Sequence, residues 1–334
     1  MAKMRAMTYE RTGAARTVLE LRELPRPEPG PGEVLVRVAV SGVNPSDAKT
    51  RAGARAPIAY PLVIPHSDGA GRIEAVGAGV DPARLGQRVW LWNAAWGRAF
   101  GSCAEFVALP EAQAVPLPDG ASYAEGACLG IPAQTAHRCL FADGPVEGLR
   151  VLVTGGAGAV GGYAVQMARL AGAAQVLTTV SGEAKAAFAQ SLGAQAVINY
   201  RAPAVAEAVL AASGGQRVDR IVEVEFGGNL ALSRAVLADN GVIAAYGSMA
   251  DPEPVLPFYP MMFAGQVLRM VLVYKLPEAA RAAAIADLNR WLAASALRHP
   301  VALSVPLAET AAAHEAVEGS DRMGAVLVEV AEGV

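Results

Sequence analysis

The chain has 334 residues, a length typical of two domains. With 53% hydrophobic and 18% charged residues it can bury a large core, which excludes a disordered protein. Its net charge of −3, from 28 basic and 31 acidic residues without a basic run, does not indicate a nucleic-acid or anionic-membrane partner.

No apolar run reaches the roughly 18 residues that a membrane-spanning helix needs, and the N-terminus lacks the apolar segment of a signal peptide. The three cysteines, Cys103, Cys128 and Cys139, are too few and too scattered for a disulfide framework. We therefore expect a soluble, cytoplasmic protein.

Short strands separated by turns are predicted for the first 120 residues. The candidates are residues 33–40, 71–76, 88–91 and 103–109, with Gly, Pro or Asn between them. Their spacing of about 10–20 residues indicates an irregular antiparallel β unit. The pattern changes at Ser122, which is spaced from Glu125 as in a capping box, so a helix is expected to begin there and to kink at Pro132.

Strands alternate with helices from residue 150 on, which is typical of a parallel, doubly wound sheet with right-handed crossovers. Gly172 and Gly193 stand where a helix commonly ends in the left-handed conformation. After Pro277 an alanine-rich helix to about Leu297 precedes a last strand, helix and strand. The six predicted strands are 151–154, 175–180, 196–198, 220–224, 242–246 and 267–274, and the helices between them lie near 160–171, 183–192, 203–212 and 228–238.

The most informative segment is a glycine-rich loop with the pattern G-x-G-x-x-G, formed by Gly156, Gly158 and Gly161. It follows a predicted strand and precedes a predicted helix, as a dinucleotide-binding loop does. In such a loop the chain turns sharply, its backbone approaches a pyrophosphate, and the helix packs closely on the strand. A Cβ atom would hinder each of these three contacts, which favours glycine. The alternative is a glycine-rich turn without a ligand. A P-loop is excluded because no Lys-Ser/Thr pair follows the glycines.

The end of the second predicted strand indicates which dinucleotide would bind. It carries Ser181 and no Asp or Glu, whereas an acidic residue there is typical of NAD sites. Ser181 and Lys185 could together bind a 2′-phosphate, so we expect NADPH. The alternative is that Lys185 is a solvated side chain on an exposed helix face, and the nearby Glu183 weakens the phosphate interpretation.

With these features the sequence resembles the medium-chain dehydrogenase/reductase superfamily, and within it the zinc-independent quinone oxidoreductase (ζ-crystallin-like) branch. The resemblance runs over essentially the whole chain and is carried by residues 42–47, 66–71, 104–107, 154–162 and 192–200. It implies an α/β protein with a GroES-like β domain and a doubly wound, parallel-sheet Rossmann domain. The GroES-like domain would comprise residues 1–122 and 276–334, and the Rossmann domain residues 123–275.

The resemblance also implies which residues contact the cofactor. In NADPH-using relatives a Ser, a Lys and a Tyr hold the 2′-phosphate, and Ser181, Lys185 and Tyr200 stand at those positions. The remaining expected cofactor contacts are Asn44, Thr135, Gly156, Ala157, Gly158, Ala159, Val160, Gly161, Gly247 and Ser248.

The positions that bind the catalytic zinc in zinc-dependent members hold Asn44, Ser67 and Ile131 here. None of these is a good zinc ligand, and the run of four cysteines that holds the structural zinc is absent. His66 lies one residue from the histidine position and could supply one ligand but not three. We therefore expect no metal.

Without zinc, hydrogen bonds must polarise the substrate. The resemblance places Asn44 at the nicotinamide, where its amide could donate to the substrate oxygen or orient the ribose; alternatively, it forms a turn before Pro45. Ser46 matches a proton-relay hydroxyl, or it bonds locally to Asp47 or Lys49.

Lys49 replaces a tyrosine found in several bacterial quinone reductases. It could attract an anionic substrate or steady an enolate, or it could be solvated. Trp92 and Trp96 could line a flat substrate pocket, or they could belong to the core.

We interpret the chain as an NADPH-dependent, zinc-independent reductase of quinones or activated C=C bonds such as enones. One alternative is a 2-enoyl or 2-haloacrylate-type reductase in which Lys49 faces a carboxylate. Another is a non-catalytic NADPH-binding structural or sensor protein. The apolar strand 267–274 is expected to pair with a second copy of the chain in a homodimer.

Overall fold

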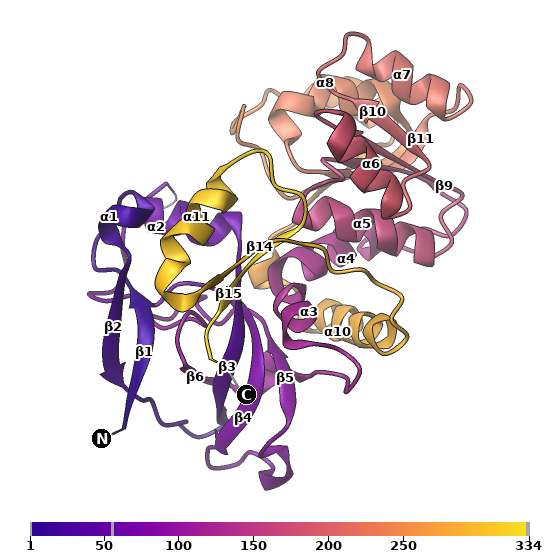
Figure 1. Cartoon of the computed structure of the whole chain (residues 1–334). Coiled ribbons are helices and arrows are strands. Elements are labelled where there is room, and N and C mark those ends of the chain that lie inside the picture. Colours follow the sequence, from indigo (N-terminus) through magenta and orange to yellow (C-terminus); the bar gives the residue numbers. More distant parts are fainter. Residues whose placement is uncertain (1, 55–56, 332–334) are drawn as a thin grey trace. The chain divides into compact units, whose positions relative to one another are not determined.

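The computed structural model describes residues 2–54 and 57–331 (Figure 1). The chain forms two compact units, of which the second consists of Pro132–Ala284 and Ala296–Arg298 and the first of the remainder. The expected boundary at residue 122 lies too early, because the following helix α3 (Tyr123–Ala127) packs on the sheet of the first unit. The expected boundary at residue 275 is also too early, since the first part of α10 (Glu278–Ala293) belongs to the second unit.

The first unit is built on a mostly antiparallel sheet with the strand order β14-β15-β3-β4-β5-β7, to which β6 adds by pairing with β3. Its long central strand is rich in valine and nearly all its residues are buried or half-buried, as a strand inside a core requires. The described strands of this sheet are β3 (Glu33–Val43), β4 (Asp68–Val76), β5 (Arg88–Leu91), β6 (Phe106–Pro110), β7 (Ala114–Pro116), β14 (Val301–Pro306) and β15 (Ala325–Glu329).

Two predicted strands of this unit have different starts. The predicted strand 71–76 already begins at Asp68, because Gly42 of β3 pairs with Asp68. The predicted strand 103–109 begins only at Phe106, because the backbone N–H groups of Ser102 and Cys103 donate to the loop carbonyls of His66 and Pro65.

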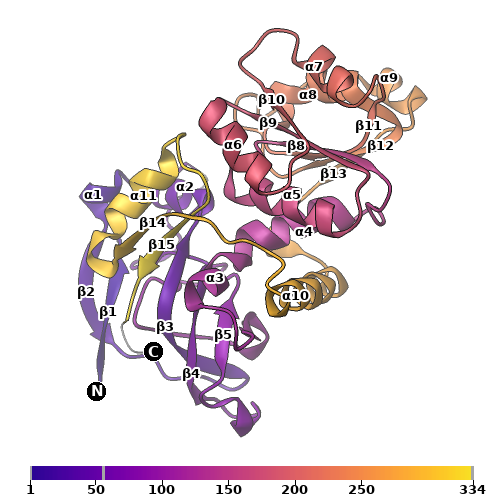
Figure 2. The ribbon, with the colours of Figure 1, turned by 45° about the vertical axis from the view of Figure 1, so that its right-hand side comes forward.

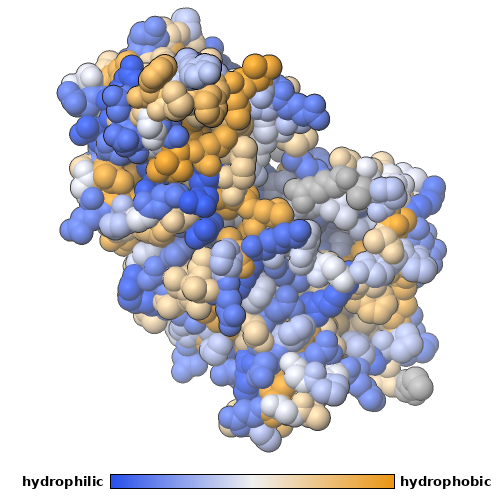
Figure 3. Space-filling model, turned by 180° about the vertical axis from the view of Figure 1, so that it is seen from behind, coloured by the Kyte–Doolittle hydropathy of each residue, from blue (hydrophilic) through white to orange (hydrophobic). Residues whose placement is uncertain are grey.

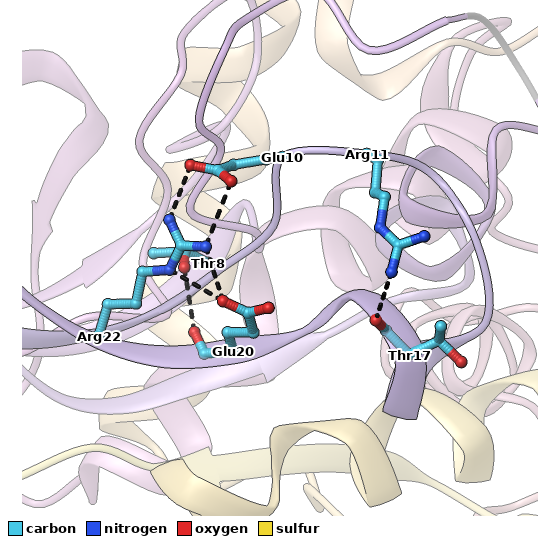
Figure 4. Close-up of polar contacts among 6 residues, drawn as sticks. All are labelled: Thr8, Glu10, Arg11, Thr17, Glu20 and Arg22. Carbon is cyan, nitrogen blue, oxygen red and sulfur yellow. Dashed lines mark hydrogen bonds and ion pairs between the residues drawn. The ribbon is translucent and has the colours of Figure 1, made fainter.

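A separate hairpin of β1 (Lys3–Thr8) and β2 (Glu20–Pro25) begins the chain. Figures 1 and 2 show it beside the helices α1 (Ala15–Val18), α2 (Pro45–Ala52) and α11 (Thr310–Glu318). Charged side chains lie on the surface of the hairpin, where the Arg22 guanidinium donates to Glu10 at 2.7 Å and to Glu20 at 2.6 Å (Figure 4). Such exposed ion pairs contribute little stability, so the backbone pairing holds the hairpin.

The second unit contains the predicted parallel sheet, confirmed among the described residues as six strands in the order β10-β9-β8-β11-β12-β13. Figure 2 shows α5 and α6 on one face of this sheet and α7 and α8 on the other. The strands are β8 (Arg150–Thr154), β9 (Gln175–Val180), β10 (Ala196–Asn199), β11 (Val218–Glu223), β12 (Leu237–Ala245) and β13 (Val267–Met270). The helices are α4 (Gln134–Phe141), α5 (Ala159–Leu170), α6 (Glu183–Ser191), α7 (Val205–Ala212), α8 (Phe226–Val236) and α9 (Phe258–Phe263).

The predicted strand 267–274 is too long. The strand stops at Met270, and the chain enters a 3₁₀ turn over Val273–Lys275, where the Arg281 guanidinium donates to the Val273 carbonyl at 2.6 Å. The predicted helix ends at Gly172 and Gly193 are confirmed, with φ of +80° and +107°.

The predicted capping box at Ser122 is confirmed, since the backbone N–H of Glu125 donates to Ser122 Oγ at 3.2 Å and Ser122 N–H donates back to the Glu125 carboxylate. The expected kink at Pro132 is a π-helical turn over Leu129–Ala133, because proline has no N–H to continue the α-helical pattern.

The three cysteines are free and buried, and burial raises the pKa of Cys103 and Cys128 to about 12. In the part of the chain that the structure describes, no helix combines the length and apolarity needed to cross a membrane.

Candidate cofactor and substrate site

The carboxyl ends of the parallel strands gather most of the predicted cofactor residues at one edge of the second unit's sheet. The glycine loop follows β8, Ser181 follows β9, Tyr200 follows β10, and Gly247 and Ser248 follow β12. The chain order reverses between β8 and β11, which are neighbours in the sheet. Such a switch point is where ligands bind in open α/β sheets.

The three glycines of the loop have different surroundings. A Cβ at Gly156 would lie closer than 3.0 Å to the Thr178 side chain, and one at Gly161 would lie equally close to the Gly155 carbonyl. A Cβ at Gly158 would meet only the Gly155 oxygen, at 3.3 Å. Packing within the protein therefore requires glycine at 156 and 161, whereas a Cβ at 158 would press on a single backbone oxygen.

Gly158 is also the N-cap residue of α5, and no side chain caps that helix. The first backbone N–H groups of α5 therefore have no partner within the helix. The positive end of the helix dipole lies at the same place. The loop and the helix start have the geometry and the charge that a pyrophosphate needs.

Ser181 and Lys185 lie together at the end of β9, as predicted. Lys185 Nζ donates to Ser181 Oγ at 3.1 Å, across one turn at the start of α6. Tyr200, at the end of the neighbouring β10, is half exposed. Glu183 is exposed at the first position of α6. The edge thus presents two hydroxyls and one ammonium group.

The loop after β12 is held by hydrogen bonds of its own. Ser248 Oγ accepts from the Gly227 N–H at 2.9 Å and donates to the Asp251 carbonyl. The Glu225 carboxylate accepts from the N–H groups of Met249 at 2.8 Å and Ala250 at 2.9 Å. The sequence analysis missed Glu225, for which no local motif gives a signal. Thr135 is buried in α4 of the same unit.

In the first unit, Asn44 lies between β3 and α2, where it is the N-cap residue of that helix. It forms a capping box with Asp47, in which the Asn44 backbone N–H donates to Asp47 Oδ2 at 2.8 Å. The Asn44 side chain is buried, and its Nδ2 atom donates to Asp68 Oδ2 at 2.7 Å. Asn44 is therefore both a turn residue, the alternative considered from sequence, and part of a buried polar cluster.

Asp68 is a functional candidate that the sequence analysis missed, although it lies within the motif 66–71. Its carboxyl group is fully buried and accepts from the Ile131 N–H at 2.9 Å (Oδ1) and 2.8 Å (Oδ2). Burial raises the pKa of Asp68 well above its usual range, while the hydrogen bonds from Ile131 and Asn44 act in the opposite direction. Asp68 thus connects the Asn44 side chain to the backbone of Ile131.

Ser46 and Lys49 lie on α2, next to this cluster in sequence. The Ser46 hydroxyl is buried and has no hydrogen-bond partner within residues 2–54 and 57–331, so the local bond to Asp47 or Lys49 is not formed. Lys49 is half-buried. A buried hydroxyl without a partner is costly unless a ligand or water satisfies it.

The two tryptophans of the predicted pocket lie in the segment after β5. Trp92 is half-buried, and its indole N–H donates to the Ala112 carbonyl at 3.1 Å. Trp96 is exposed to 43%. Neither side chain is part of the closed core of the first unit.

His66 has both ring nitrogens occupied by protein groups, with Nε2 2.9 Å from His314 Nε2 and Nδ1 2.9 Å from Ser41 Oγ. Burial lowers the pKa of His66 well below its usual range and that of His314 to about 3. Among the described residues, no group of three or more His, Cys, Asp or Glu side chains is arranged to hold a metal ion.

Comparisons with known proteins match each of the two units to a known family of domains. Residues 30–119 match the family model of the alcohol dehydrogenase GroES-like domain, and residues 159–290 match that of the zinc-binding dehydrogenases. Rat quinone oxidoreductase is 33% identical over 253 residues, which cover 75% of this chain and 75% of the relative. The chloroplast envelope quinone oxidoreductase homolog of Arabidopsis thaliana is 32% identical over 249 residues, which cover 72% of this chain and 74% of the relative.

Solved structures of similar proteins share the fold over nearly the whole chain. A mycobacterial protein complexed with NADPH is 29% identical, with a TM-score of 0.85 over 98% of this chain and 99% of that chain. A quinone oxidoreductase of Pseudomonas syringae is 25% identical, with a TM-score of 0.85 over 98% and 99% of the two chains.

Proposed function

The chain belongs to the medium-chain dehydrogenase/reductase superfamily, and on that premise we propose that it is an NADPH-dependent, zinc-independent reductase of quinones or of activated C=C bonds such as enones. The observation that carries the proposal is the Ser181–Lys185 pair at the tip of β9, beside a glycine loop that leads into the uncapped start of α5. The pair supports NADPH because it offers a hydroxyl and a cation, with no carboxylate at the strand tip, to a 2′-phosphate.

When bound, NADPH supplies a hydride from its nicotinamide ring. The backbone of the glycine loop and the start of α5 bind the pyrophosphate, and Ser181, Lys185 and Tyr200 bind the 2′-phosphate. The other residues assigned to the cofactor are Asn44, Thr135, Gly247 and Ser248, of which Ser248 acts by shaping its loop.

Asn44 donates a hydrogen bond to the substrate oxygen on which negative charge develops. Ser46, whose buried hydroxyl has no partner in the described part of the protein, relays a proton toward that oxygen. Lys49 attracts substrates that carry an anionic group. Trp92 and Trp96 offer flat apolar faces to a quinone ring.

Steady-state turnover tests this proposal. Purified enzyme is expected to oxidise NADPH in the presence of quinones and enones, and to use NADH much less well. Tight NADPH binding without turnover over a broad panel of both substrate classes would instead indicate a binding protein.

A pair of glycine variants separates ligand binding from packing. Gly158→Ala is expected to weaken NADPH binding and to lower the melting temperature less than Gly161→Ala does, because its Cβ would press on one backbone oxygen at 3.3 Å. Gly161→Ala is expected to destabilise the protein by about 1–3 kcal/mol, because its Cβ would collide with the Gly155 carbonyl. Cofactor titration and thermal unfolding measure both effects. Equal losses of stability in the two variants would contradict the assignment of Gly158 to the ligand.

Metal independence is expected because Asn44, Ser67 and Ile131 offer no set of zinc ligands. Elemental analysis of the purified protein should find well under one zinc per chain. Chelators should leave NADPH-dependent activity intact. Stoichiometric zinc would overturn this part of the proposal.

We also propose a homodimer formed through the segment 267–274, of which Val267–Met270 is a strand. β13 is the outermost strand at its side of the sheet, and apolar side chains around it and on α9 are exposed. Phe263, for example, is exposed to 82%. Orange patches on the face drawn in Figure 3 show that hydrophobic residues also reach the surface in groups.

Light scattering at micromolar concentration is expected to give about twice the 34.3 kDa of one chain. Introducing charges with Phe263→Glu and Met270→Glu should produce monomers, whereas Leu85→Glu, at an exposed leucine of the first unit, should not. A wild-type particle of one chain mass would contradict the dimer.

A further inference from the structure

Asn44 is held by neighbours through its backbone and through its side chain. Its backbone N–H donates to Asp47 Oδ2 at 2.8 Å, and its backbone carbonyl accepts from the Asp47 N–H at 3.0 Å, which fixes residue 44 at the start of α2. The Nδ2 atom donates to Asp68, which is its one acceptor among the described residues. Because Nδ2 carries two hydrogens, one of them remains to be donated elsewhere.

Asp68 is itself fixed in place. The backbone N–H of Ile131 donates to both of its carboxyl oxygens. A Cβ at Gly130 would lie closer than 3.0 Å to Asp68 Oδ1, so the carboxyl group packs directly against the π-helical turn. Within residues 2–54 and 57–331, the hydrogen-bond partners of this carboxyl group are Ile131 N–H and Asn44 Nδ2, and both are donors, so Asp68 accepts from each of them.

This arrangement selects one of the two orientations of the Asn44 amide. If the amide turned over, its carbonyl oxygen would face Asp68 Oδ2, which already accepts from the Ile131 N–H, and two acceptors would lie in contact without a hydrogen between them. The Nδ2 end is therefore kept on the side of Asp68, and its second hydrogen has a fixed direction.

We propose that Asp68 is a positioning residue that holds Asn44 as a hydrogen-bond donor for the reacting oxygen. The inference rests on the proposed function, because the Asn44 amide that Asp68 orients is the group proposed to donate a hydrogen bond to the substrate. Asp68 contributes by fixing the direction of the donor before the reaction begins, as preorganised sites do.

Two variants test the role of Asp68. In Asp68→Leu the new side chain has a shape similar to that of aspartate but accepts no hydrogen bond, so the Asn44 amide is no longer held in one orientation. The exchange variant Asn44→Asp/Asp68→Asn keeps a carboxylate and an amide in contact but removes the donor from position 44. Thr310→Val is the matched control, because Thr310 is buried in the same unit and donates to the Leu307 carbonyl at 2.7 Å.

Four quantities are measured for each variant: the melting temperature, the dissociation constant for NADPH, kcat and KM for cyclohex-2-enone, and the ¹⁵N–¹H signals of the Asn44 side chain. The Asn44 signals are identified by their absence in Asn44→Ala. In the wild type, one amide hydrogen should be shifted downfield by its bond to the carboxyl group.

Asp68→Leu should abolish that shift and lower kcat at least about ten-fold, with KM and the NADPH dissociation constant within about two-fold. The exchange variant should have a melting temperature close to that of the wild type, but its kcat should stay well below the wild-type value. Thr310→Val should lower the melting temperature and leave kcat unchanged. Normal kcat in Asp68→Leu, or recovered kcat in the exchange variant, would overturn the proposal.

The outcomes also separate this inference from the function on which it rests. If the wild type reduces neither quinones nor enones, the proposed function fails, while the amide spectra still decide whether Asp68 fixes Asn44. If Asp68→Leu does not fold, the wild-type spectrum decides. A wild-type Asn44 amide without a downfield hydrogen would then refute the role of Asp68.

Discussion

Replacing Lys185 with alanine is expected to weaken NADPH binding ten-fold or more and to leave the weak binding of NADH nearly unchanged. A charge-assisted hydrogen bond to the 2′-phosphate contributes about 1.5–3 kcal/mol where it is well formed, which corresponds to roughly ten-fold or more in affinity. NADH has no phosphate at this position, so it loses nothing when the ammonium group is removed. Fluorescence titration with each cofactor measures the two affinities.

Lys275→Ala is the matched control, because it removes the same charge from the same unit at a position outside the predicted phosphate site. It should leave both affinities unchanged. Ser181→Ala should reproduce a smaller part of the Lys185 effect, since it removes the hydroxyl that Lys185 contacts. Equal losses for NADPH and NADH in Lys185→Ala would mean that Lys185 acts through folding.

Asn44→Ala is expected to lower enone reduction by about 10²–10³-fold in kcat, the loss seen when one preorganised donor is removed from other oxyanion sites. Quinone reduction should suffer less, because a quinone accepts a hydride readily without that donor. The melting temperature and NADPH binding are measured alongside kcat. Both should be largely retained.

The comparison of the two substrates within one variant controls for damage to the fold, which would slow both reactions alike. Unchanged turnover of both substrates would leave Asn44 with the role of helix cap alone. Catalysis would then depend on the positioning of cofactor and substrate.

Features with a local cause could be predicted from the sequence. The glycine loop, the individual strands and the capping box at Ser122 follow from residues a few positions apart, so the local sequence is enough to predict them. The Ser181–Lys185 contact is local too, because four residues make one helical turn.

Features that depend on distant parts of the chain could not be predicted. Asp68 contacts Asn44, 24 residues away, and Ile131, 63 residues away, and only the folded sheet brings these groups together. β13 ends early where its partner β12 ends, since the pairing of the two strands stops at Ala245 and Met270. Glu225 holds the N–H groups of residues 249 and 250.

The most direct test of the proposed activity follows the hydride itself. The enzyme is supplied with NADPH that carries deuterium at one or the other of the two C4 positions of the nicotinamide, together with cyclohex-2-enone. Mass spectrometry should find the deuterium on the β-carbon of the saturated ketone with one of the two labelled cofactors and not with the other. A saturated ketone without deuterium from either cofactor, or no ketone at all, would contradict hydride transfer by this protein.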